Sequence, residues 1–209
     1  MKSAWLKVAL VFCVFLMAAG CGKDKEIAKG PMPQEFSATM ASTSAGQTIT
    51  SKIYMKPGKF RADSEMAGSS TIVRQDLNKA WTIMTSQKTY MEMEGVSDIQ
   101  HQTISETVKG EVSRKELGRE TVAGHSAIKY ELTTKADGKV VILHQWWATD
   151  INFPVKTAAD DGSWVMEYRD INIGSQPDSL FDIPSGYQKL SIPGLPGGMK
   201  IGIPGEGKK

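Results

Sequence analysis

The residues that could carry catalytic or metal chemistry are few and scattered. The histidines are His101, His125 and His144, and each lies in a different predicted element. A metal site needs clustered His, Cys or carboxylate ligands, and no spacing here places two of them on one face beside a third. Gly124-His125-Ser126 lacks the G-x-S-x-G frame of a nucleophile elbow, and no Gly-rich loop opens a helix to cradle a phosphate. The sequence therefore predicts a protein that is not an enzyme and that holds no metal or cofactor.

The first residues of the chain end at a cysteine with an evident chemical use. Lys2 and Lys7 precede the apolar run VALVFCVFLMAAG. This run is shorter than the roughly 20 residues needed to span a bilayer core. A positive start, a short apolar run and a small-residue exit are the parts of a secretory signal. The exit, AAGC, resembles the lipobox of bacterial lipoproteins, whose cysteine receives a diacylglyceryl group on its sulfur. The resemblance implies a signal peptide over residues 1–20 and a membrane anchor on Cys21.

Two other interpretations of this segment stay open. An uncleaved signal would remain as a membrane anchor, and ordinary cleavage near Ala19 would leave Cys21 as a free thiol. Gly22 follows Cys21, where lipoproteins retained at the inner membrane commonly carry Asp. The resemblance therefore implies an outer-membrane lipoprotein that faces the periplasm. No cysteine follows Cys21, so a disulfide in the folded part is not expected.

Composition divides the rest of the chain into three parts. Residues 21–35, broken by glycine and proline, are predicted to be a flexible linker, and residues 36–190 form one domain long enough for a sizeable core. Residues 191–209 are rich in Gly and Pro and are predicted to be disordered, while their apolar residues would also suit a segment that binds a partner or a cavity. Lys2 and Lys7 account for the excess of 25 basic over 23 acidic residues. No basic stripe indicates nucleic acid.

Alternation of polar and apolar residues is the dominant pattern in the domain. In residues 58–66, apolar or small residues alternate with charged ones, as in a strand with one packed and one wet face. Turn signals such as Asp137-Gly138 and Asp161-Gly162 predict consecutive hairpins of an antiparallel sheet. The predicted strands are 35–43, 47–56, 58–66, 69–75, 79–84, 88–93, 111–118, 125–135, 139–149, 153–158 and 163–172. A capping pair predicts a helix within Gly95–Val108, and a short turn is expected at Pro177–Phe181.

Several segments follow an order that is typical of one superfamily. They are KIYMKPGKFRADSEM, IVRQDLNKAWTIMTSQKTYMEM, PVKTAADDGSWVMEYRDINIG and PDSLFDIPSGYQKL. In these segments the chain resembles the outer-membrane lipoprotein carrier and its lipoprotein receptor, and most closely a family of bacterial lipoproteins whose domain has no assigned activity. The resemblance implies a mainly β (α+β) fold, in which a strongly curved antiparallel sheet forms an incomplete β-barrel with one or two short helices on its concave side. It also implies that the concave side is apolar and takes up acyl chains.

The leading hypothesis is a non-enzymatic envelope lipoprotein that binds a lipid or the acyl part of a lipoprotein. The chain contains 11 Met and 5 Trp; methionine suits adaptable apolar surfaces, and any one of these residues also suits plain core packing. The candidate contacts are Phe36, Ile53, Met55, Phe60, Trp81, Ile83, Trp147 and Trp164. The alternative is a protein-interaction or envelope-sensor module with a filled core and no lipid ligand.

Overall fold

The strands of the domain form a single sheet. The computed structural model describes residues 31–64, 66–96, 104–136 and 138–190, and the sheet has 12 strands. The strands are β1 (Phe36–Ser44), β2 (Gln47–Lys56), β3 (Lys59–Ser64), β4 (Ser69–Arg74), β5 (Lys79–Met84), β6 (Thr89–Glu94), β7 (Glu111–Val122), β8 (His125–Ala136), β9 (Lys139–Ala148), β10 (Phe153–Ala159), β11 (Trp164–Ile173) and β12 (Gln188–Lys189). The predicted strands correspond to β1–β11, and β12 is an addition.

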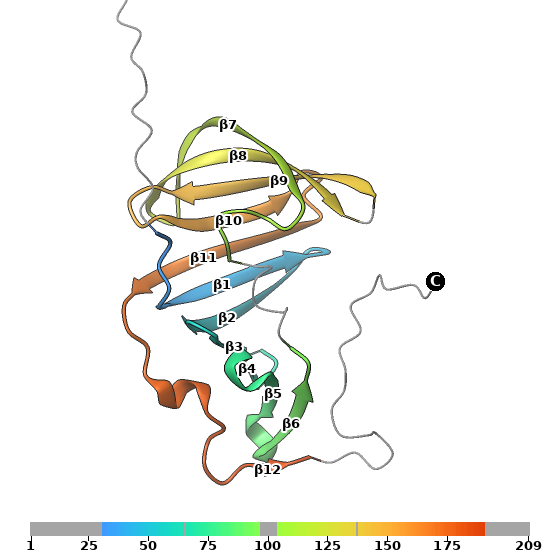
Figure 1. Cartoon of the computed structure of the whole chain (residues 1–209), viewed down its shortest axis with the longest axis vertical. Helices are drawn as coiled ribbons and strands as arrows, with labels where there is room; N and C mark the ends of the chain where they lie inside the picture. Colours follow the sequence, from blue (N-terminus) through green and yellow to red (C-terminus); the bar gives the residue numbers. More distant parts are fainter. Residues whose placement is uncertain (1–30, 65, 97–103, 137, 191–209) are drawn as a thin grey trace, which may run out of the picture.

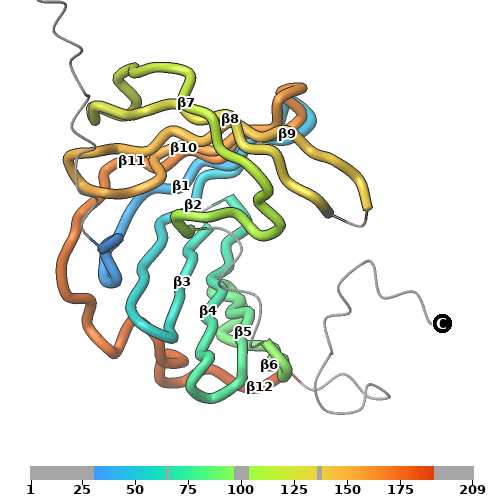
Figure 2. The backbone as a smooth tube through the Cα atoms, turned by 45° about the horizontal axis from the view of Figure 1, so that its top comes forward, coloured from blue at the N-terminus to red at the C-terminus, as the bar shows by residue number. Residues whose placement is uncertain are grey.

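The sheet is open and strongly curved. Its strand order is β12-β6-β5-β4-β3-β2-β1-β11-β10-β9-β8-β7, so β12 and β7 are the edges. All neighbours pair antiparallel except β12, which pairs parallel with β6. Figure 1 shows this order running from β7 at the top to β12 at the bottom. In Figure 2, β7–β11 run across the picture and β3–β6 run down it, which displays the twist between the two halves. The predicted fold class, a curved antiparallel sheet that forms an incomplete barrel, is confirmed.

Tight turns join the strands where the sequence predicts them. Gly58, Gly138 and Gly162 have φ values of 72°, 74° and 70°. This left-handed region costs glycine little and other residues more, so glycine selects these turns. Asn78 adopts the same region with φ 53° and closes the short 3₁₀ turn η1 (Gln75–Leu77). The hairpin prediction therefore follows from local turn chemistry.

Helical structure is confined to short 3₁₀ turns in the described residues. The turn expected at Pro177–Phe181 is η4 (Asp178–Phe181), and η2 (Thr85–Gln87) lies in a hairpin loop. The helix predicted within Gly95–Val108 is wrong for residues 95–96 and 104–108, which are bends or irregular, and residues 97–103 lie outside the described part. No helix among the described residues has the length and apolar character needed to cross a membrane. The predicted signal peptide, Cys21 and the tail 191–209 also lie outside the described residues.

Candidate apolar binding face

The strand register gathers methionines on one face of the sheet. Directly paired residues on neighbouring strands share a face, and so do residues two apart along a strand. Phe36 on β1 pairs with Met55 on β2, and Met55 pairs with Phe60 on β3. The register extends this face to Met93 on β6 and, through Met40, to β11. The methionines of the described strands all share it: Met40, Met55, Met84, Met91, Met93 and Met166. We call this surface the methionine face.

The methionine side chains are half-buried rather than sealed in a core. Met40, Met55 and Met166 pack against the central cluster of buried apolar residues, and Met93 packs against a smaller cluster around Val73. All six retain intermediate exposure. Unbranched thioether side chains change rotamer easily and fill irregular spaces. This face therefore combines apolar character, partial access to solvent and adaptable shape.

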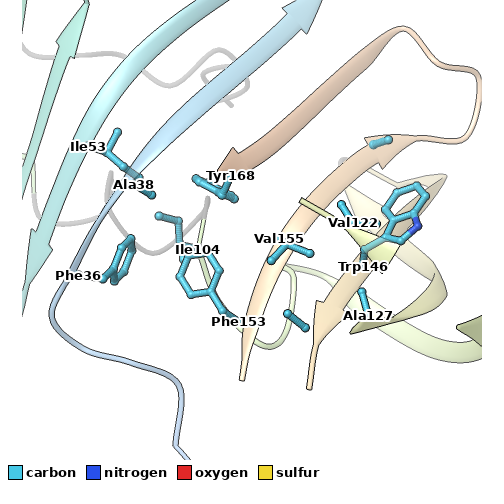
Figure 3. Close-up of a cluster of buried hydrophobic side chains, with 12 residues drawn as sticks. Phe36, Ala38, Ile53, Ile104, Val122, Ala127, Trp146, Phe153, Val155 and Tyr168 are labelled. Atoms are coloured by element: carbon cyan, nitrogen blue, oxygen red, sulfur yellow. The ribbon is translucent and has the colours of Figure 1, made fainter. Parts of the chain in front are cut away.

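Aromatic rings support the centre of the methionine face. Phe36 and Phe153 meet edge to face with ring centroids 4.9 Å apart, and Phe153 and Tyr168 do so at 5.5 Å. Figure 3 shows Ile104, from the connection between β6 and β7, beside these rings. The Tyr168 hydroxyl donates to Met166 Sδ at 2.9 Å, and burial raises the pKa of Tyr168 above its ordinary value. The hydroxyl is therefore neutral at physiological pH, and it keeps the cluster free of charge.

The β7–β9 end of this face is filled. Trp147 and Leu132 are fully buried there, and Val108 of the β6–β7 connection packs on them. Arg114 fixes that connection: its guanidinium donates to Gln145 Oε1 at 2.9 Å and to the Glu106 carbonyl at 2.5 Å. Satisfied polar networks of this kind hold a segment in one place. The partly open portion of the methionine face therefore lies toward β1–β6.

The opposite face of β4–β6 is covered by the C-terminal segment. Phe181, in η4, is fully buried against Ile72, Trp81 and Ile83. Trp81 follows Ala80, whose partner is Met93, so Trp81 and Ile83 lie on the side of the sheet away from the methionines. Burial of these large rings contributes about 25 cal/mol per Å² of apolar surface removed from water. Trp81 and Ile83 are thus core residues of a second layer. We call residues 176–190, which form this layer, the strap.

Charged groups fasten the strap to the sheet at several points between η4 and β12, and Figure 1 shows the course of this segment from β11 to β12. Asp178 accepts from Lys59 Nζ at 2.6 Å and from Lys56 Nζ at 3.2 Å, and these ammonium groups lower the pKa of its carboxyl. Arg74 Nη1 bonds to Asp182 at 3.1 Å. At the far end, Glu92 accepts from Trp81 Nε1 at 3.0 Å and from Lys189 Nζ at 2.9 Å.

These contacts explain the electrostatics of Glu92. Hydrogen bonds from Trp81, from Lys189 and from Lys79 favour its ionised form and lower its pKa from 4.5 to about 2. Burial opposes this shift, and the side chain is 15% exposed. Glu92 therefore stays ionised at any ordinary pH and ties β12 to the sheet.

The structure separates the predicted ligand contacts into three groups. Phe36, Ile53, Met55 and Phe60 lie on the methionine face. Trp147 and Trp164 lie on the same side of the sheet at its filled end, where Trp147 Nε1 donates to Asn152 at 3.0 Å.

The third group, Trp81 and Ile83, lies under the strap. The eight predicted ligand contacts therefore do not form one site. Five residues of this face are not among the contacts predicted from the sequence: Met40, Met84, Met91, Met93 and Met166. Strand alternation contained their signal, but only the register shows that separate strands contribute to one face.

The histidines lie apart from one another wherever the structure describes them. His125 Nδ1 is 2.7 Å from Asp150, and His144 Nε2 is 3.8 Å from Asp160, so each has a single carboxylate neighbour. Across the described ranges, no group of three or more His, Cys, Asp or Glu residues is arranged to hold a metal ion. His101 lies outside the described residues.

Comparisons with known proteins give a family and distant structural similarities. A family model described as a domain of unknown function (DUF4412) matches residues 37–152. No curated protein matches the sequence. The Mycobacterium tuberculosis lipoprotein LppX is 15% identical, and the match covers 73% of this chain and 92% of LppX with a TM-score of 0.49.

The Pseudomonas aeruginosa MucA/MucB complex also matches. It is 15% identical, and the match covers 70% of this chain and 54% of that chain with a TM-score of 0.48. This chain spans between 54% and 60% of the MucB chains that it matches.

Proposed function

We propose that this chain, which belongs to the DUF4412 family, is a non-enzymatic lipoprotein of the cell envelope that binds an apolar ligand on the methionine face. The ligand class is a lipid or the acyl part of a lipoprotein. One observation carries the proposal: the methionines of five different strands converge on one half-buried face, while the opposite face of β4–β6 is covered by the strap. An acyl chain varies in length and unsaturation, and mobile thioethers adapt to such variation.

The energetics favour a chain-like apolar ligand. Each methylene that leaves water contributes about 0.8 kcal/mol, so about ten methylenes would contribute about 8 kcal/mol before the costs of association. The charged groups of the strap face are paired with one another, whereas the methionine face offers thioethers, aromatic rings and the neutral hydroxyls of residues such as Thr71 and Thr82. Burial rather than charge would therefore hold the ligand.

Attachment of the protein to the outer membrane through Cys21 is part of the same proposal. More than one acyl chain on this cysteine would make attachment long-lived. Labelled palmitate should be incorporated into the unaltered chain and not into a Cys21→Ser variant, and fractionation of a two-membrane host should place the unaltered chain in the outer membrane. Palmitate labelling of the variant, or recovery of the unaltered chain in the inner membrane, would contradict this part.

Photo-crosslinking tests the binding face. Cells that produce the full chain are given a fatty acid with a photoreactive group, and ultraviolet-dependent crosslinks are mapped to peptides, which separates ligand from a lipid on Cys21. Peptides from β5 and β6 should be labelled. Met91→Glu should reduce labelling severalfold, because a carboxylate disfavours an apolar ligand.

Met66→Glu is the matched control, since Met66 is 76% exposed in the turn before β4. The Met66→Glu variant should be labelled as strongly as the unaltered chain. Absence of labelling on the methionine face, or equal labelling of Met91→Glu, would refute apolar ligand binding. A lipid-free chain that crosslinks instead to one stoichiometric envelope protein would establish the interaction-module alternative.

A further inference from the structure

The edge strand β7 is long and open on one side. It has 12 residues, and its pairing partner is β8. From residue 115 to residue 121 every side chain is exposed, and no strand of the described ranges pairs with the outer edge of β7. An open edge of this length presents unpaired backbone donors and acceptors that favour addition of another strand.

A β-bulge at Leu117 changes which side chains of β7 share a face. Glu116 pairs with Tyr130 and Gly118 pairs with Lys129, so Leu117 is the extra residue. Tyr130 and Ile128 lie on one face of β8, and Ile128 pairs with Arg119. Glu116 and Arg119 therefore share a face although they are three residues apart, whereas a regular strand would place them on opposite faces. By the same shift, Lys115 and Glu120 share the other face.

This arrangement makes the edge complementary to itself. A two-fold axis between Leu117 and Gly118 would pair β7 antiparallel with β7 of a second copy. Glu116 would then face Arg119 of the second copy, and Lys115 would face Glu120 of the second copy, each pair on one face. Among the described residues Lys115, Glu116 and Arg119 form no ion pair, and Glu120 accepts a hydrogen bond from Trp146 Nε1; opposite charges directly across strands stabilise pairing. The bulge shifts the alternation of side chains along β7. Each of these two oppositely charged pairs therefore lies on a single face of the joined sheet.

Apolar contact would form at the same axis. Leu117 is 43% exposed, and the axis brings it beside Leu117 of the second copy. Symmetric interfaces repeat every contact, so each favourable pair counts twice. A single pair of strands buries less surface than a standard protein interface. The association should therefore depend on protein concentration, which is high when chains share a membrane surface.

We propose that β7 is a homodimerisation edge, and that two copies of this chain join their sheets antiparallel about an axis between Leu117 and Gly118. The occupant of the edge is a second copy rather than an unrelated strand because the charge order Lys-Glu-Leu-Gly-Arg-Glu is complementary to itself in that register. The inference does not depend on the proposed ligand.

Charge exchange tests the register. The mass of the full chain, purified in mild detergent, is followed by size-exclusion chromatography with light scattering as protein concentration is raised. The unaltered chain should move from monomer to dimer. Glu116→Lys and Arg119→Glu should each raise the dissociation constant about tenfold or more, because each places like charges opposite one another at two symmetric positions. The double variant E116K/R119E exchanges the two charges and should restore the dimer.

Every result of the light-scattering experiment either supports or overturns the homodimer. Far-UV circular dichroism of all variants should match the unaltered chain, since the substituted residues are exposed. A chain that is monomeric at every concentration overturns the proposal, and so does a double variant that stays as weakly associated as the single variants. A dimer that ignores all three substitutions places the interface elsewhere and also overturns it. Lys139→Glu, in the exposed start of β9, is the matched control and should leave the dimer unchanged.

Discussion

Removing the charge of Glu92 should release one end of the strap from the sheet. In Glu92→Gln the side chain keeps its shape but loses the charge that binds Lys189 and Lys79. The pKa of Glu92 is about 2 in the folded chain against an ordinary value of 4.5. Since one pKa unit corresponds to about 1.4 kcal/mol, the ionised carboxylate contributes at most about 3 kcal/mol. Partial exposure reduces this to about 2 kcal/mol.

The sign of the pH dependence follows from the depressed pKa. The contribution of Glu92 is fully present above pH 4.5, and it is lost as the pH falls through about 2. Urea unfolding of the unaltered chain and of Glu92→Gln between pH 7 and pH 2 should therefore give a stability difference that is largest at neutral pH and shrinks on acidification. Glu94→Gln is the control, because Glu94 is 58% exposed and 4.0 Å from Lys79; it should change stability by less than about 0.5 kcal/mol. A difference that is constant with pH would refute the electrostatic account of the strap.

Substitutions at three further positions test packing and hydrogen bonding in the fold, each by urea unfolding. Phe181→Ala should cost about 3 to 5 kcal/mol, because it empties a fully buried site under the strap; a loss below 1 kcal/mol would contradict that role. Gly110→Ala should cost more than about 2 kcal/mol, since φ is +78° and the added Cβ would collide with the Lys135 carbonyl, and unchanged stability would show that this turn relaxes. Arg114→Ala should cost about 2 kcal/mol by leaving buried Gln145 without its donor, whereas the more conservative Arg114→Lys should recover part of the loss, and no recovery would contradict the hydrogen-bond explanation.

The strands were predictable because their signals are local. Alternation of side chains and glycine turns act within a few residues, so β1–β11 follow from the sequence with small differences at their ends. The bend at residues 104–108 was not predictable in the same way. Its conformation is set by Arg114, on the strand that follows, and by Gln145, 40 residues from Ser105, and this network overrides a local capping pattern.

The candidate site was predictable only in part, and β5 shows why. Alternation reveals that Trp81 and Ile83 share one side of the strand while Ala80 and Met84 share the other. It does not reveal which side faces the methionines. The bulkier pair suggests the interior of a barrel, but Phe181, about a hundred residues further along the chain, covers that pair from the opposite side. Residue size therefore indicated the wrong side of β5 for the ligand. The strap forms a second core on that side, and the alternation within one strand does not reveal it.

The strap and the methionine face lie on opposite sides of β4–β6 and have different roles. Phe181, Arg74 and Glu92 hold the strap on β4–β6 through contacts that leave the methionine face untouched. The strap thus supplies one core for β4–β6, while on the methionine side Val73, Ala80 and Val96 are buried and Met84, Met91 and Met93 stay half-buried. Half-exposed thioethers bury less apolar surface than enclosed ones and stabilise the fold less, which is a cost. Here the strap offsets that cost, which gives a physical reason for the methionines to remain partly uncovered at the side where a ligand would bind.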